Sequence, residues 1–157
     1  MSQVKMEDID SQMVTLKQQG AAASGYKGQL TKVTKRLERA KEQLDSASFQ
    51  EAQACYDNLN RQLDNFNKAL DKLENCIADM SVTIELGFSL ANDIKKGNAR
   101  NEYLEKLGKL KGNINKSEEE IESSSVNMEK IQKHAIEVMA SKEEEKEKAQ
   151  EEKFRAN

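Results

Sequence analysis

Residues 52–84 read AQACYDNLNRQLDNFNKALDKLENCIADMSVTI and hold the most regular pattern of the chain. Apolar residues recur in alternating steps of four and three, and the residues between them are mostly Asn, Gln, Asp, Lys and Glu. This spacing places the apolar side chains on one face of an α-helix, as in the seam of a coiled coil. We predict a long helix whose core seam is Tyr56, Leu59, Leu63, Phe66, Leu70, Leu73, Ile77 and Met80.

Two flanking segments repeat the period. The first runs from Leu16 to Leu44, where only Gln19 breaks the apolar series, and the second runs from Tyr103 to Val138 with Ser at two seam positions. Glycine costs a helix about 1 kcal/mol relative to Ala. The glycine-rich stretch 20–28, GAAASGYKG, is therefore a kink, a mobile joint or a close-packing face, and the sequence does not choose between them.

Boundary signals divide the chain into three helices. Ser48-x-x-Glu51 fits a capping box at the start of a helix. Lys95-Lys96-Gly97-Asn98 places two cations in the last turn of a helix, then a Gly that ends it and an Asn that caps the next helix. We predict helices over residues 6–45, 48–95 and 99–140 within one bundle, 1–140, followed by a charged helical or frayed tail, 141–157. Short connections favour antiparallel neighbours, so the expected fold is all-α, an elongated antiparallel bundle or coiled coil of three long helices.

Composition agrees with this class. The 157 residues include no Pro and no Trp, 4% aromatic and 34% charged side chains, which is poor material for a β-sandwich, a barrel or an α/β enzyme. No apolar stretch approaches the length of a membrane span, and the first residues have no signal-peptide core. We expect a cytoplasmic protein and leave specialised secretion open.

Residues suited to catalysis are few. Cys55 and Cys76 flank seam positions, where cysteine usually serves as a small apolar side chain, and His134 is the one histidine. Glu-x-x-His, which supplies carboxylate metal sites in bundles, does not occur, and no phosphate-binding loop is present. We therefore expect no catalytic, cofactor-binding or metal-binding residues and no enzymatic activity.

Charge comes in alternating blocks rather than in one basic face. Residues 95–117 hold 7 basic and 2 acidic side chains, whereas residues 118–157 hold 7 and 12. Basic clusters without interleaved aromatic residues fit nucleic acid poorly, and blocks of opposite sign suit neighbouring helices. A nucleic-acid or lipid-surface binder stays as an alternative.

Beyond Ile84 the helix becomes too apolar for one narrow seam. We predict an additional contact zone for a partner at Leu86, Phe88, Leu90 and Ile94. By elimination, the expected function is that of a non-catalytic helical interaction protein, an adaptor, escort chaperone or structural subunit. Its partner would be another helical protein or a second copy, bound through heptad helices.

Residues 44–80, LDSASFQEAQACYDNLNRQLDNFNKALDKLENCIADM, resemble the second half of the WXG100 (ESAT-6-like) helical hairpins of type VII secretion systems. The resemblance covers roughly residues 10–85 and consists of a helix, a short break of small residues, and an aromatic residue near the start of a long heptad helix. The family's Trp-x-Gly turn and Tyr-x-x-x-Asp/Glu export signal are absent, and the third helix is additional. The resemblance implies a secreted protein or, more in keeping with these departures, a toxin escort or adaptor.

Overall fold

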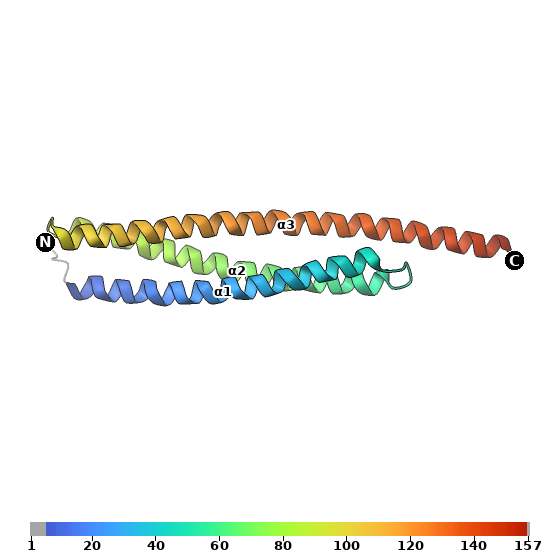
Figure 1. The fold of residues 1–157 in the computed structure, drawn as a ribbon, viewed down its shortest axis with the longest axis horizontal. Helices are drawn as coiled ribbons and strands as arrows, with labels where there is room; N and C mark the ends of the chain where they lie inside the picture. Colours follow the sequence, from blue (N-terminus) through green and yellow to red (C-terminus); the bar gives the residue numbers. More distant parts are fainter. Residues whose placement is uncertain (1–5, 157) are drawn as a thin grey trace. The chain divides into compact units, whose positions relative to one another are not determined.

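The computed structural model describes residues 6–156 and contains three long α-helices, with no strand in that range. The helices are α1 (Met6–Ser46), α2 (Ala52–Asn92) and α3 (Asn98–Ala156), as Figure 1 shows. This confirms the predicted all-α class with three long helices packed against one another. No helix in this range is long and apolar enough to cross a membrane.

The helices form two compact units. Unit 1 comprises Met1–Gly28 and Leu70–Glu122, and unit 2 comprises Gln29–Ala69 and Ser123–Asn157. Each unit therefore contains one segment of every helix and has its own core.

The core of unit 2 follows the heptad positions of the sequence. Phe66 is 2% exposed, and Tyr56 at the start of the predicted seam is only half-buried. The other buried apolar residues of the three helices are Leu30, Leu37, Ala40, Leu44, Ala52, Leu59, Leu63, Ala69, Ile131 and Ala135. Alternating three- and four-residue steps thus place one buried face on each helix.

The α1–α2 connection lies in unit 2. The Ser48 carbonyl accepts hydrogen bonds from the N–H groups of Glu51 and Ala52, at 3.0 and 2.9 Å. The Ser48 carbonyl, rather than the side-chain bonds of a capping box, therefore opens the first turn, and regular helix begins at Ala52 rather than at residue 48.

The core of unit 1 combines short and long side chains. Its buried apolar residues are Ile9, Leu16, Ala23, Leu70, Leu73, Ile77, Met80, Ile84, Ala91, Tyr103, Leu107, Ile114 and Ile121. Two hydrogen bonds join α1 to α2 here, from Gln12 Nε2 to the Thr83 carbonyl and from Cys76 Sγ to the Gln19 carbonyl. Since the partner's number falls as the α1 number rises, α1 and α2 run antiparallel within this unit.

The α2–α3 boundary differs in detail from the prediction. Helix α2 ends at Asn92 rather than at residue 95. The N–H groups of Asp93 and Ile94 donate to the carbonyls three residues earlier, and not four as in an α-helix. Gly97 has no positive φ and so forms no left-handed cap, but its carbonyl accepts the Asn101 N–H at 3.1 Å. Gly97 thus opens α3, where Asn98 was predicted to do so.

Helix α3 continues through residues 141–156, here called the α3 extension, so the helical alternative for the charged tail is the one that the structure has in this range. Figure 1 shows this part running on past the α1–α2 connection. Most of its side chains are exposed. Its Glu, Lys, Gln and Ala are strong helix formers, which accounts for helix without a packed face.

Candidate helix-binding groove

The predicted contact zone at the end of α2 offers little apolar surface. Leu86 is 57% exposed, but Phe88, Leu90 and Ile94 are half-buried. The Lys111 ammonium lies 5.6 Å from the centre of the Phe88 ring and 3.3 Å from Glu85 Oε1, so α3 covers Phe88. The structure leaves Leu86, with Val82 one turn earlier, as the exposed apolar part of this face.

A larger apolar feature lies between α1 and α3 in unit 1. Two depressions of about 590 and 310 Å³ share Gly20 and Leu110, and together we call them the α1–α3 groove. The larger depression is lined by Asp10, Met13, Val14, Leu16, Lys17, Gly20 and Leu110. The smaller one is lined by Gly20, Ala23, Ser24, Lys27, Ile77, Met80, Leu110, Asn113, Ile114, Lys116, Ser117 and Glu120.

The groove exists because α1 presents small side chains at this level. A Cβ built on Gly20 would meet no heavy atom within 4 Å, and Ala23 fills its seam position with a single methyl group. Ile77 and Met80 of α2 form the floor of the smaller depression, and both are buried, at 3% and 6% exposed. Val14 on the wall is 55% exposed, which leaves an apolar side chain open to a partner.

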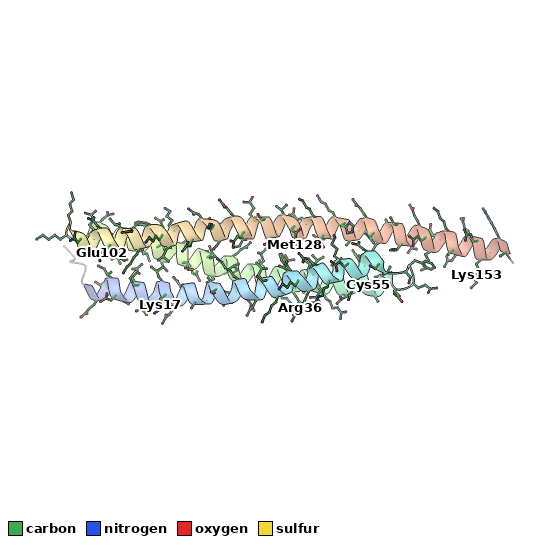
Figure 2. All side chains as sticks on the ribbon, in the orientation of Figure 1. Lys17, Arg36, Cys55, Glu102, Met128 and Lys153 are labelled. Atoms are coloured by element: carbon green, nitrogen blue, oxygen red, sulfur yellow. The ribbon has the colours of Figure 1, made fainter. Side chains whose placement is uncertain are left out.

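The middle of the groove is basic. Lys17 and Lys116 make no ion pair with any residue in the range 6–156. Lys27, the last α1 residue of the lining, adds a third cation toward one end. Lys17 is labelled on α1 in Figure 2. Asp10 and Glu120 lie toward the two ends. The groove thus combines an apolar floor with cations along its central part, an arrangement suited to an apolar ridge flanked by carboxylates.

The two cysteines and the histidine do not form a reactive cluster. Cys76 is half-buried, and burial, with the charge of Asp79 as a second cause, raises the pKa of its thiol and so disfavours the thiolate. His134 Nε2 lies 2.6 Å from Asp45 Oδ1 rather than beside a cysteine. Among the residues that the structure describes, no three side chains are grouped so that they could hold a metal ion.

Tyr103 is the other perturbed group. Its hydroxyl is buried with no hydrogen-bond partner in the described part of the chain, and burial raises its pKa. The ring packs against α2 at Gly87, where an added Cβ would lie 2.9 Å from the hydroxyl oxygen. Tyr103 is therefore explained as a packing residue on the α2–α3 side of unit 1.

Comparison with known proteins adds no relative: no protein-family model, curated protein or solved structure matches the chain. The groove is not among the features predicted from the sequence. The feature that could have indicated it is the run of small and polar residues 19–25, QGAAASG. The heptad pattern alone does not show whether this face of the helix is open.

Proposed function

We propose that this protein is a non-catalytic interaction protein that binds an amphipathic helix in the α1–α3 groove. The observation that carries the proposal is the apolar groove itself, with Val14 half exposed on its wall. A helix laid into a groove buries an apolar ridge with anchors spaced by three and four residues.

The dimensions of the groove suit one helix. On α1 its lining runs from Asp10 to Lys27, which corresponds to about 26 Å at 1.5 Å per residue. That length accommodates roughly 17 residues, or about five helical turns. A bound helix would complete a four-helix arrangement in unit 1 and cover Val14 and the half-buried Leu110.

Affinity capture with groove variants tests the proposal. The wild-type chain, coupled to a support, should retain one stoichiometric protein from the native cells, identified by mass spectrometry. Val14→Asp should abolish its retention, because a carboxylate would be buried in an apolar contact. Val126→Asp is the matched control, since Val126 is 45% exposed and lies outside the groove in unit 2.

A third variant, Leu86→Asp, separates the groove from the contact zone predicted at the end of α2. Loss of the partner with Leu86→Asp but not with Val14→Asp would overturn the groove as the binding site. A captured toxin with a helical amino-terminal domain would support the escort role implied by the WXG100 resemblance. Salt-sensitive retention on heparin or anionic vesicles, with no protein captured, would instead favour a surface binder.

A further inference from the structure

We propose that a second copy of this chain can occupy the α1–α3 groove with its α3 extension, anchored by Phe154. The inference rests on the proposed function of the groove and names one occupant. It would make partner binding and self-association compete for one site.

The α3 extension is a helix without a packed face. Residues 143–148 and 150–156 are all exposed, and Phe154 is 85% exposed. The side chains of the extension, including labelled Lys153, project away from the helix in Figure 2. A docking site of matching shape would remove this phenylalanine from water, and burial of its apolar surface would favour binding.

One face of the extension is acidic and ends in this aromatic ring. Glu143, Glu147 and Glu151 are spaced by four residues, and Phe154 follows three residues later. At 3.6 residues per turn, these four side chains share one face of the helix. Glu145 lies on the opposite face, and the lysines of the extension lie outside the face of Phe154.

The groove matches this face in apolar and charged positions. Phe154 fits the larger depression between Val14 and Leu110. With Phe154 there and the extension antiparallel to α3, Glu151 comes level with Lys17 and Glu147 comes near Lys116. The opposite direction would run the acidic row toward Asp10. The antiparallel direction runs it past Lys17 and Lys116 and brings Glu143 to the end of the groove that holds both Lys27 and Glu120, so the favourable charge pairs are those of Glu151 and Glu147.

Length and connectivity identify the source of the occupant. The extension is about 24 Å long, close to the roughly 26 Å that the groove spans along α1. Because α3 is continuous from Asn98 to Ala156, an extension that entered the groove of its own chain would have to leave this helix. A second copy can supply its extension with α3 intact.

Sedimentation velocity on the full chain, from micromolar to millimolar concentration, tests the inference. The wild type should associate in a concentration-dependent manner, more weakly at high salt. Phe154→Ala and Glu147→Lys should each weaken association by at least about tenfold. Glu145→Lys is the matched control, because it reverses the same kind of charge on the opposite face and should associate like the wild type.

Charge exchange gives the decisive variant. Lys116→Glu should weaken association alone, whereas the double variant Lys116→Glu, Glu147→Lys should recover it, because the opposite charges are again paired between copies. A wild type that stays monomeric, or association that survives Phe154→Ala or Val14→Asp, would overturn the inference. A monomeric wild type that still loses its partner on Val14→Asp would leave the proposed function intact, so the two failures are distinguishable.

Discussion

The side shared by α1 and α3 differs between the two units. In unit 1 it is an open groove, lined by Val14, Gly20 and Leu110. In unit 2 the same two helices are joined by the Asp45–His134 pair, and Leu37 and Leu44 of α1 are almost fully buried. The same heptad spacing thus produces an open face in one unit and a bridged one in the other.

Side-chain size explains the difference. One row of α1 at seven-residue spacing is buried along its whole length, and it consists of Ile9, Leu16, Ala23, Leu30, Leu37 and Leu44. Ala23 is the small member of that row and lines the smaller depression, whereas all members of the row in unit 2 are leucines. Volume at the seam positions, rather than their spacing, decides whether two helices close upon each other.

The largest expected effect concerns the filled core of unit 2. Phe66→Ala should lower the free energy of unfolding by about 3–5 kcal/mol, because Phe66 is 2% exposed and a cavity would remain. Phe88→Ala in unit 1 is the control and should cost less, since Phe88 is only half-buried. Urea denaturation followed by circular dichroism measures both, and an unchanged midpoint for Phe66→Ala would remove this residue from the core.

These two units also show what a sequence of this kind can predict. The three helices and their buried faces follow from apolar spacing, because burial of one helical face depends only on which positions are apolar. The groove could not be predicted, since the heptad pattern says which face Gly20 and Ala23 occupy but not how far away α3 lies. The prediction that Phe88 belongs to a contact zone missed that Lys111 lies over its ring. Lys111 is distant in sequence and charged, so the apolar pattern does not indicate this contact.

The α2–α3 side of unit 1 should behave as a tightly packed contact, in contrast to the open α1–α3 side. Gly87→Ala should destabilise the protein by about 1–2 kcal/mol, because the new methyl group would lie 2.9 Å from Leu107 Cδ2 and from the Tyr103 hydroxyl. Gly108→Ala is the matched control, with no heavy atom within 4 Å of its Cβ, and should stabilise α3 by about 0.5–1 kcal/mol. Thermal melts that move in the same direction for both variants would contradict this contrast.

A substitution at Tyr103 tests the same contact between α2 and α3, with a smaller expected change in the free energy of unfolding. Tyr103→Phe should stabilise the protein by about 1 kcal/mol at neutral pH, because it removes a buried hydroxyl that lacks a hydrogen-bond partner. Burial raises the pKa of Tyr103 above its ordinary value of 10.0, so the folded protein keeps the phenolic proton to a higher pH than the unfolded chain does. The wild type therefore loses stability as the pH rises from 10 through the folded-state pKa, and Tyr103→Phe does not. The stability difference between Tyr103→Phe and wild type should therefore grow above pH 10.

Denaturation of the wild type and Tyr103→Phe at a series of pH values measures this difference. The raised pKa of Cys76 affects both proteins alike and cancels in the comparison. A constant difference across the alkaline range would mean that the Tyr103 hydroxyl reaches water in the folded protein.

The smallest effect is expected at the bridge that joins α1 to α3 in unit 2. His134→Ala should cost less than about 1 kcal/mol, because the His134 and Asp45 side chains are 40% and 37% exposed and such pairs are screened by water and salt. Lys133→Ala, a neighbouring exposed position, is the control for loss of a surface side chain. Denaturation at low and high salt should show a small loss that salt reduces further. A loss well above 2 kcal/mol at both salt concentrations would mean that the bridge, and not the buried leucines of α1, holds this side of unit 2 together.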